Sequence, residues 1–459
     1  MKTFSIITLG CKTNQYDGQQ IREFLERMGL RYVPPAHNRV DLAVANTCCV
    51  TSAAAAKSRQ CVHRLQKLAA GTVVVCGCLP ASKRLAVSHS DERTCCIGDR
   101  RRLAGQLRQI IRGGAATDGA EAPPVSPKPP DQAEAGDHAG ATCLNLGPIT
   151  RFQGHTRAFL KIQDGCDRNC SYCIIPKCRP RMESKPVDAA LREAEILTRA
   201  GHREIVLTGV LLGAYGREKN NRGPRIRGSR DNQALARLLD AMAGIKGIER
   251  IRLGSLEPAD ITPRLLDSFR NNPKVMPHLH LCLQSGSDSI LRAMRRRYTA
   301  ADFLRAVDLA KSRLDRPALT ADVMVGFPGE TDFDFEKTVT LARKAAFAGM
   351  HVFSFSPRSG TKAAGLAGRV DAKTAAERSR ILRRLDGELS LRFREQFLGQ
   401  KAAVLIERGG NRARGRSERY FMVEVTGGAA RRNDIVKVVI TSAGGGTARA
   451  KAARYVFSL

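Results

Sequence analysis

The 459-residue sequence has no tryptophan, and aromatic residues make up only 5% of it. This composition leaves little material for an aromatic protein–protein interface. Long apolar runs are missing as well: no segment reaches the roughly 18 to 20 apolar residues that a membrane span requires. The N-terminal residues have neither the apolar core of a signal peptide nor a small-residue cleavage site. These absences predict a cytoplasmic protein that does not associate with a membrane.

Acidic residues are scarce relative to basic ones. The chain carries 44 Asp and Glu against 76 Lys and Arg, a formal net charge of +32. So basic a chain attracts polyanions, because binding releases their counterions. Nucleic acid is the favoured partner. An anionic membrane surface is the alternative, and a generally Arg-rich proteome would give the same excess without any such partner.

The chain is long enough for about three domains. Residues 1–112 alternate expected strands at 5–9, 42–46 and 72–75 with helices at 19–28 and 53–69. This alternation is typical of an α/β domain with a parallel sheet. Residues 113–142 are rich in Ala, Pro, Gly and Asp and carry five acids against one base. We interpret them as a flexible linker.

The second half of the chain contains two further regions. In residues 143–398, six strands are expected at 158–163, 204–208, 250–253, 279–283, 320–325 and 351–355. Six βα units predict a partial (βα)6 barrel, with its active site on loops at the C-terminal ends of the strands. Residues 399–459 are β-rich and hold twelve Lys and Arg against four Asp and Glu, with strands expected at 402–407, 420–425 and 435–441. A small basic β-barrel of this kind typically binds nucleic acid, and a capping domain with a solvated basic face is the alternative.

Fourteen cysteines in a long chain without a signal peptide indicate metal binding or catalysis in preference to disulfides. The sharpest pattern is Cys166, Cys170 and Cys173, a C-x3-C-x2-C spacing directly after an expected strand. Three thiolates on a tight loop can hold a [4Fe-4S] cluster and leave one iron open. A structural zinc site with Cys178 as fourth ligand is the alternative, but zinc sites more often show two C-x2-C pairs.

An open iron can chelate the amine and carboxylate of S-adenosylmethionine (SAM). One electron from the cluster then splits a carbon–sulfur bond of SAM and yields a 5′-deoxyadenosyl radical, which removes hydrogen from unactivated C–H bonds. The motif therefore predicts a radical-SAM enzyme.

A second set of cysteines lies near the N-terminus. Cys11, Cys48 and Cys78 each follow an expected strand, so all three should meet at one edge of the parallel sheet and hold a second cluster. The alternative is that they are buried small hydrophobic residues. We choose Cys48 over Cys49 because it comes directly after Asn-Thr at the strand end, and we expect Cys76 to be packed inside its strand. The remaining cysteines are interpreted as structural: Cys61, Cys95, Cys96, Cys143 and Cys282.

These motifs resemble the methylthiotransferase family of radical-SAM enzymes over nearly the whole chain except the linker. The resemblance rests on Leu-Gly-Cys-Lys-Thr-Asn-Gln-Tyr-Asp (9–17), Asn-Thr-Cys (46–48), Gly-Cys (77–78), the loop at 165–176, and the blocks at 280–288 and 322–331. The C-terminal segment resembles a TRAM domain, an RNA-binding module. Residues 12–17 are most similar to the branch that acts on N6-threonylcarbamoyladenosine at position 37 of tRNA.

The resemblance implies two [4Fe-4S] clusters and two uses of SAM. One SAM would methylate sulfur held on the N-terminal cluster, and the other would give the radical that takes hydrogen from C2 of the adenine, where the methylthio group is then placed. It also implies a tRNA anticodon loop as substrate and an electron donor of flavodoxin or ferredoxin type. The C2–H bond is poorly acidic, so a radical route is chemically reasonable.

Residues on loops after the barrel strands are candidates for binding SAM: Gly209, Glu257, Gln284, Ser285, Gly326 and Glu330. Glycines let the backbone approach the ligand, and the polar side chains can bind its ammonium, carboxylate or ribose. Glu257 precedes a proline and would otherwise cap a helix, and Gln284 would otherwise satisfy the barrel interior.

Candidate RNA contacts form a basic run in the TRAM-like segment, beside Tyr420 and Phe421: Arg412, Arg414, Arg416 and Arg419. Arginine pairs phosphates, and aromatic rings stack on unpaired bases. Residues 295–297 are a second basic run, and a solvated charged face is the alternative for each run. Three residues depart from the family pattern. Pro180 stands where glycine is usual and stiffens the loop, Leu211 stands where many members have a polar residue, and Cys282 stands where proline is common.

Three functions are therefore weighed. The first is the methylthiotransferase for threonylcarbamoyladenosine of tRNA. The second is the same chemistry on another substrate, isopentenyladenosine of tRNA or a ribosomal protein. The third is a non-enzymatic zinc- or cluster-bearing RNA-binding protein, which leaves the separate trio Cys11, Cys48 and Cys78 unexplained.

Overall fold

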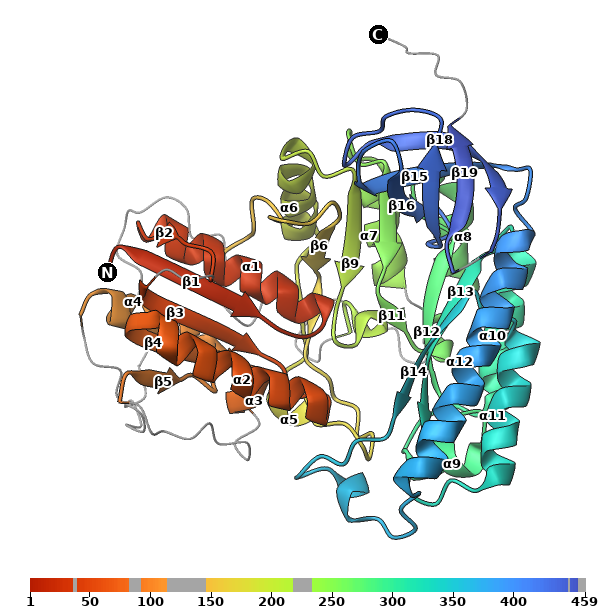
Figure 1. Ribbon diagram of the computed structural model, residues 1–459, viewed down its shortest axis with the longest axis horizontal. Coiled ribbons are helices and arrows are strands. Elements are labelled where there is room, and N and C mark those ends of the chain that lie inside the picture. The colour runs from red at the N-terminus through yellow and green to blue at the C-terminus, as the bar shows by residue number, and fades with distance from the viewer. Residues whose placement is uncertain (36–38, 82–91, 114–145, 218–232, 445, 453–459) are drawn as a thin grey trace. The chain divides into compact units, whose positions relative to one another are not determined.

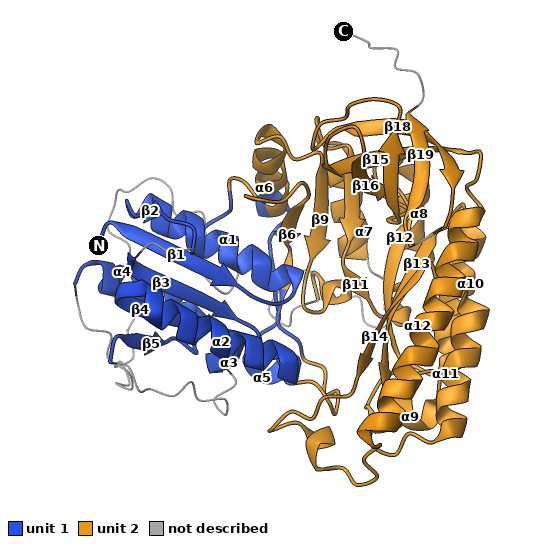
Figure 2. Cartoon of the chain, in the orientation of Figure 1, with its two compact units in different colours: residues 1–149, 164–166, 174–189 blue, residues 150–163, 167–173, 190–459 orange. Residues whose placement is uncertain are grey.

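The computed structural model describes residues 1–35, 39–81, 92–113, 146–217, 233–444 and 446–452. The predicted linker, apart from Gly113, and Cys143 lie outside these residues. The chain divides into two compact units (Figure 2). Unit 1 comprises Met1–Ile149, Asp164–Cys166 and Ile174–Ala189, and unit 2 comprises Thr150–Gln163, Asp167–Cys173 and Ala190–Leu459. The predicted domain boundaries stay predictions.

Unit 1 is built on a five-stranded parallel sheet with the order β2-β1-β3-β4-β5. Its strands are β1 (Thr3–Thr8), β2 (Arg31–Tyr32), β3 (Val40–Thr47), β4 (Ala69–Gly77) and β5 (Thr94–Cys96), and its helices are α1 (Lys12–Arg27), α2 (Ser52–Leu68), α3 (Cys78–Ala81), η1 (Arg100–Arg102), α4 (Leu103–Ile111) and α5 (Ile175–Cys178). The predicted parallel-sheet α/β fold is confirmed.

Alternating side chains explain why helices cover both faces of this sheet. Leu42 and Val44 of β3 pack with residues of α1 and α4, whereas Ala43 and Ala45 pack with residues of α2. Cys76 lies in β4, is 2% exposed and belongs to the α1–α4 side, as predicted for a packed cysteine. The burial of apolar side chains on both faces supplies the main stabilisation of the unit.

Helix α1 begins seven residues earlier than the predicted helix, at Lys12 instead of Gln19. The first turns, from Thr13 to Gly18, are polar and contain a glycine, so they lack the apolar spacing of a surface helix. They are nevertheless buried, because α1 lies against β1 and β3. The early start places Cys11 at the N-cap of the helix.

The first part of unit 2 holds two parallel sheets, β10-β9-β6 and β11-β12-β13-β14. Their strands are β6 (Ala158–Lys161), β9 (Glu204–Thr208), β10 (Arg250–Leu253), β11 (Ser255–Leu256), β12 (His278–Gln284), β13 (Ala318–Val325) and β14 (Gly349–Ser354). Strand β10 contacts β12, so six principal strands follow one another in chain order. All six were predicted, and the partial barrel is confirmed.

Helices cover the outer face of these strands. They are α7 (Gln233–Ala243), α8 (Pro263–Asn271), α9 (Asp288–Ala293), α10 (Ala300–Arg313), α11 (Asp332–Ala345) and α12 (Ala372–Glu395), with the 3-10 turns η2 (Leu212–Ala214), η3 (Pro258–Asp260) and η4 (Lys362–Gly365). Figure 1 shows α10, α11 and α12 side by side. Leu279, Leu281 and Leu283 are fully buried, while His280 and Cys282 between them are half-buried on the opposite face.

The C-terminal part of unit 2 is a closed five-stranded barrel with the order β15-β16-β17-β19-β18. Its strands are β15 (Lys401–Arg408), β16 (Ala413–Ser417), β17 (Met422–Thr426), β18 (Ile435–Ser442) and β19 (Ala448–Ala452). Closure removes the exposed sheet edges. The predicted strand at 420–425 begins only at Met422, because Tyr420 has a φ of 73° and lies in a turn.

The remaining elements are β7 (Gln163–Asp164) and β8 (Glu183–Ser184), which pair in a two-stranded sheet, and helix α6 (Val187–Arg199). No helix within the described ranges is long and apolar enough to cross a membrane.

Candidate functional site

Three cysteines of unit 1 lie at one edge of its sheet. Cys11 follows β1, Cys48 follows β3 and Cys78 follows β4. These strands are neighbours, and their last residues are in register, Thr8 with Asn46 and Thr47 with Gly77. Parallel strands bring their C-terminal ends to the same edge, so the predicted placement of the three cysteines at one edge is confirmed, while their role as cluster ligands stays a prediction. Cys11 is exposed, while Cys48 and Cys78 are buried.

Hydrogen bonds hold the loops that carry Cys11 and Cys48. The Asn14 carboxamide donates to the carbonyl oxygens of Leu9, at 2.5 Å, and Thr47, at 3.2 Å, and the Asn46 carboxamide donates to the Asn14 carbonyl at 2.8 Å. These bonds join the end of β1 to the end of β3. Asn14 and Asn46 belong to the sequence motifs, but their role in joining the two loops could not be predicted from the sequence.

Gly10 keeps space beside the Cys48 thiol. Its φ is 105°, and a Cβ atom built on it would lie 2.9 Å from the Cys48 Sγ. Any larger residue would need a strained backbone and would displace the sulfur. The Cys48 peptide is itself fixed, because its N–H donates to the Ser58 Oγ at 3.0 Å and its carbonyl accepts from the same hydroxyl at 2.8 Å.

Burial disfavours the thiolate form of two of these cysteines. Burial raises the pKa of Cys48, with Cys11 and Cys49 adding to the effect, and burial raises the pKa of Cys78 to about 12, with Arg179 and Arg100 opposing it. Within the described ranges, no three His, Cys, Asp or Glu side chains are grouped to hold a single metal ion. An iron–sulfur cluster needs a different arrangement, because each thiolate binds its own iron. Cys48 beside the space that Gly10 keeps, with Cys11 and Cys78 at the same sheet edge, fits such a cluster.

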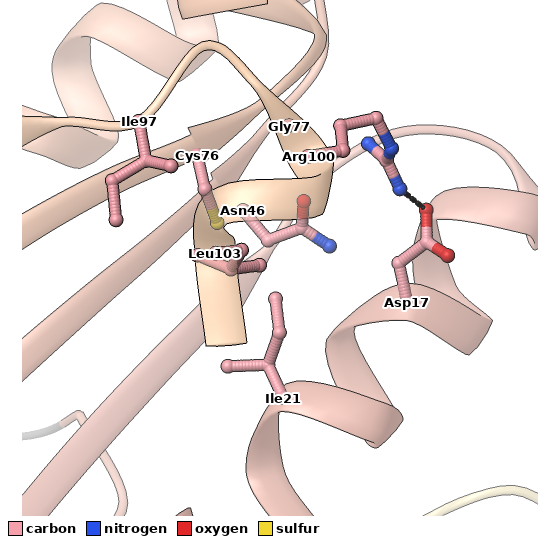
Figure 3. Close-up of a pocket in the computed structure, with 8 residues that line it drawn as sticks. All are labelled: Asp17, Ile21, Asn46, Cys76, Gly77, Ile97, Arg100 and Leu103. Carbon is pink, nitrogen blue, oxygen red and sulfur yellow. Dashed lines mark hydrogen bonds and ion pairs between the residues drawn. The ribbon is translucent and has the colours of Figure 1, made fainter. Parts of the chain in front are cut away.

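A buried ion-pair network adjoins this edge. Arg179 donates from Nη2 to the Asp17 carboxylate at 2.7 Å and from Nη1 to the Asp164 carboxylate at 2.7 Å, and Arg100 also binds Asp17. The side chains of Arg179, Asp17 and Asp164 are at most 2% exposed. Figure 3 shows Arg100 reaching Asp17 at a hollow that Cys76 and Gly77 also line. The network was not predicted, since nothing in the sequence connects residue 17 with residues 100, 164 and 179.

Two further thiols lie close to Cys78. The Sγ atoms of Cys49 and Cys178 are 3.8 Å apart, and both thiols donate to the Cys78 carbonyl, at 3.3 and 3.4 Å. Cys178, the proposed fourth ligand of the zinc alternative, therefore packs among cysteines of the N-terminal sheet. Cys49 is fully buried in the core on the α2 side.

The loop of the C-x3-C-x2-C motif begins in unit 1. Gly165 has a φ of 79°, and a Cβ atom on it would lie 1.5 Å from the Arg181 carbonyl oxygen, so only glycine fits before Cys166. The Cys166 N–H donates to the Arg179 carbonyl at 3.0 Å. Arg179 thus binds Asp17 of α1 with its side chain and Cys166 with its backbone. Of the departures from the family pattern, Pro180 is exposed and Leu211 is buried.

The rest of this loop belongs to unit 2 and is attached to the end of α9. The Ser171 N–H donates to the Met294 carbonyl at 3.1 Å, and the Ser171 hydroxyl donates to the Ala293 carbonyl at 2.7 Å. The Cys173 N–H donates to the Cys170 carbonyl at 3.2 Å. Both cysteines are half-buried.

Arg296 lies beside this loop, although the sequence analysis had grouped it with the basic run 295–297 as a candidate RNA contact. Its Nη1 donates to the Cys170 Sγ at 3.4 Å, and its Nη2 lies 3.0 Å from the Glu257 carboxylate. Glu257 also pairs with Arg168 at 2.7 Å. Burial would lower the pKa of Arg296, but Tyr298, Tyr172, Cys170 and Glu257 raise it, so its charge is secure.

Glu257 also caps a helical turn, which was the structural alternative for this residue. It is the N-cap of η3 and forms a capping box with Asp260, whose carboxylate accepts the Glu257 N–H at 2.9 Å. Its carboxylate is engaged by Arg168 and Arg296. Its assignment to SAM stays a prediction.

The other SAM candidates lie after strands of the barrel. Gln284 has a φ of 66°. Its buried Oε1 has no hydrogen-bond partner among the described residues, and neither has the buried Oε1 of Glu330. Two buried acceptors without donors fit a ligand that carries an ammonium group and hydroxyls. Glu330 is held by Arg378, at 2.8 Å, and by the Gly326 N–H, at 2.6 Å.

Two further SAM candidates contact the surrounding structure. Gly209 follows β9, and a Cβ atom there would lie 3.0 Å from the Gln163 side chain. The Ser285 hydroxyl is buried, accepts the Ser287 N–H at 3.2 Å and lies 3.4 Å from the Thr338 hydroxyl. Cys282, the third departure from the family pattern, has its pKa raised to about 12 by burial.

The four candidate RNA-binding arginines differ in their surroundings. Arg412 is exposed in the turn before β16, and Arg414 is exposed but pairs with Glu424 at 2.8 Å. Arg416 donates to the Tyr420 carbonyl at 2.9 Å, and Arg419 pairs with Asp315 at 2.9 Å. Tyr420 stacks on His278 and Phe421 stacks on Phe397, so both rings have partners within the protein.

Comparison with known proteins identifies the class of enzyme. The model of the radical SAM superfamily matches residues 160–342, and the model described as "Uncharacterized protein family UPF0004" matches residues 3–98. Among solved structures, the radical SAM methyltransferase TsrM from Kitasatospora setae is similar in fold, with a TM-score of 0.54 and 14% identity over 79% of this chain and 74% of that chain. The chain is a radical-SAM enzyme.

Curated relatives narrow the class to a family. The threonylcarbamoyladenosine tRNA methylthiotransferase of Thermotoga maritima is 32% identical over 89% of this chain and 87% of its own length, and that of Bacillus subtilis is 30% identical over 97% and 95%. The tRNA-2-methylthio-N(6)-dimethylallyladenosine synthase of Frankia alni is 32% identical over 96% and 87%. The chain belongs to the radical-SAM methylthiotransferase family, whose enzymes use SAM and [4Fe-4S] clusters.

Proposed function

We propose that this enzyme converts N6-threonylcarbamoyladenosine at position 37 of tRNA to its 2-methylthio derivative. The observation that carries the proposal is the meeting of Cys11, Cys48 and Cys78 at one sheet edge, in a chain that also holds the C-x3-C-x2-C loop. Two cysteine trios suit two separate tasks, one holding the sulfur that is transferred and the other generating the radical. An RNA-binding protein without catalysis has no use for both.

The two cysteine trios have different roles in the proposed reaction. Cys166, Cys170 and Cys173 hold the cluster that binds SAM, and Cys11, Cys48 and Cys78 hold the other. When bound, the reduced cluster and SAM supply the radical chemistry that removes hydrogen from C2 of the adenine. The buried acceptors of Gln284 and Glu330 orient SAM, because they are left without donors otherwise.

The choice of substrate is supported by the relatives named for threonylcarbamoyladenosine, which include those of Thermotoga maritima, Chlamydia pneumoniae and Bacillus subtilis at 30–33% identity. The relative from Frankia alni, named for dimethylallyladenosine, is also 32% identical and favours the second candidate substrate. The anticodon loop is single-stranded, so base 37 can reach the enzyme without the unpairing of a duplex. Exposed Arg412 and Arg414 are the arginines that fit a phosphate contact.

The test is a competition between two substrates. The enzyme is reconstituted anaerobically with iron and sulfide and incubated with SAM, reductant and an equal mixture of two tRNAs, one carrying threonylcarbamoyladenosine and the other dimethylallyladenosine at position 37. Mass spectrometry of the nucleosides should find the methylthio group on threonylcarbamoyladenosine. Its appearance on dimethylallyladenosine would move the enzyme to the second substrate, and a Cys166→Ala variant serves as the inactive control.

A further inference from the structure

Arg296 makes direct contact with a proposed cluster ligand. Its guanidinium has three neighbours: Nη1 donates to the Cys170 Sγ at 3.4 Å, Nη2 lies 3.0 Å from the Glu257 Oε1, and Nε donates to the Tyr298 hydroxyl at 3.1 Å. The side chain is only 7% exposed. A buried guanidinium with one N–H directed at a sulfur is placed differently from a solvated surface charge.

The position of Arg296 is fixed by the fold. It follows α9, and its backbone N–H donates to the Leu291 carbonyl at 2.9 Å. The Tyr298 hydroxyl, which accepts from Arg296, donates in turn to the Leu283 carbonyl at 2.8 Å, at the end of β12. The loop with Cys170 is attached to the same segment, because Ser171 donates to the Met294 carbonyl. The guanidinium and the thiol are therefore held by one piece of structure.

Burial beside a cysteine distinguishes Arg296 from its neighbours in sequence. Arg295 and Arg297 are exposed. They keep the role of a basic surface run that the sequence suggested for all three. Arg296 instead shares Glu257 with Arg168, which lies on the same loop as Cys170.

We propose that Arg296 is a positioning residue that favours the reduced state of the cluster bound by Cys170. The proposal rests on the proposed function, since it needs the cluster on Cys166, Cys170 and Cys173. Reduction adds one electron from the external donor and hence one negative charge to the cluster. Hydrogen bonds to ligand sulfurs and nearby charge set the potentials of such clusters. An N–H donor that carries positive charge strengthens as the sulfur becomes more negative, so it raises the reduction potential.

The test is a redox titration of the reconstituted full-length enzyme, followed by electron paramagnetic resonance with and without SAM. SAM coordinates the open iron of the cluster on Cys166, Cys170 and Cys173, so the change of signal on binding SAM reports on that cluster. In Arg296→Gln, the ratio of reduced to oxidised cluster at a fixed potential should fall about tenfold, which corresponds to about 59 mV for a one-electron couple. Arg296→Lys keeps the charge and should recover part of the shift.

Arg297→Gln is the matched control, because it removes the same charge from the same loop at an exposed position. It should leave the midpoint unchanged. A residue with only a structural role would change stability or iron content but not the midpoint of the cluster that remains. An Arg296→Gln enzyme with its full iron content and the wild-type midpoint would therefore overturn the proposal.

A second variant keeps the proposal testable if Arg296→Gln loses its iron. Glu257→Gln removes the negative charge that competes for the Arg296 guanidinium, so the midpoint should rise. A midpoint that is unchanged or lower would overturn the role of Arg296. If the wild-type enzyme shows no SAM-sensitive signal, the proposed function fails and this role fails with it. A SAM-sensitive signal whose midpoint does not move in Arg296→Gln, or in Glu257→Gln where Arg296→Gln has lost its iron, removes this role alone.

Discussion

Replacing Asp17 by asparagine should destabilise unit 1 far more than its small change in shape suggests. Asp17 is 1% exposed and pairs with both Arg100 and Arg179. With Asp164, the network contains two guanidiniums and two carboxylates. Asparagine keeps the volume but leaves two buried positive charges with one carboxylate. Removing one partner of a buried ion pair costs about 3–5 kcal/mol, and every ~1.4 kcal/mol is a factor of ten in the folding equilibrium.

The assay is hydrogen–deuterium exchange of the full chain, read on peptides from β3 and β4. Exchange of these core amides requires opening of the unit, so it should accelerate by about two to three and a half powers of ten, the equivalent of that cost. Glu26→Gln is the control, because it breaks the Arg22–Glu26 pair on the same helix, where both side chains are more than 20% exposed. Such a pair contributes only about 0.3–0.5 kcal/mol. Equal acceleration in the two variants would refute the reasoning.

Three further changes are predicted. Gly165→Ala should destabilise the loop by at least about 1–2 kcal/mol in thermal unfolding, because its φ is 79° and the new Cβ would meet the Arg181 carbonyl; an unchanged melting temperature would contradict this. Burial acts to raise the pKa of Asp334, but hydroxyl hydrogen bonds hold it well below the usual value. Asp334→Asn should therefore lose stability at neutral pH, and its difference from the wild type should shrink as the pH falls below about 3.9; a difference that grows in acid would oppose this. Arg412→Gln should weaken tRNA binding and reduce the salt slope by about one, whereas Arg419→Gln, whose guanidinium is bound within the protein, should keep the slope.

Much of the fold could be predicted because most of its strands are runs of apolar residues. All six principal barrel strands and three strands of the N-terminal sheet occur where the sequence placed them. Strands β16 and β19 were missed for a physical reason. Their inward residues are Ala413, Gly415 and Ser417 in one and Ala448 and Ala450 in the other, which are buried but too small to mark an apolar face, while Arg and Lys alternate with them.

The placement of Cys11, Cys48 and Cys78 at one sheet edge was predictable, because their position after parallel strands follows from local sequence. Their support was not predictable, since it comes from residues far apart in the chain. Arg179 meets Asp17 across 162 positions, and Arg296 meets Cys170 across 126. In the basic run 295–297, the sequence cannot distinguish Arg296 from its neighbours. Only the fold buries Arg296 and leaves Arg295 and Arg297 exposed. Glu257 shows the converse, because a residue expected at a ligand is engaged by two arginines.

The central claim is that the two cysteine trios hold separate clusters with separate tasks, and Cys78→Ala tests it most directly. Cys76→Ala is the control, because Cys76 lies two residues earlier in β4 and packs in the core. The wild type and the control should hold about eight irons, the content of two four-iron clusters, and form methylthio nucleoside. Cys78→Ala should hold about four, still cleave SAM to 5′-deoxyadenosine, and form no methylthio product. Full iron content in Cys78→Ala, or methylthio product formed by it, would contradict the account.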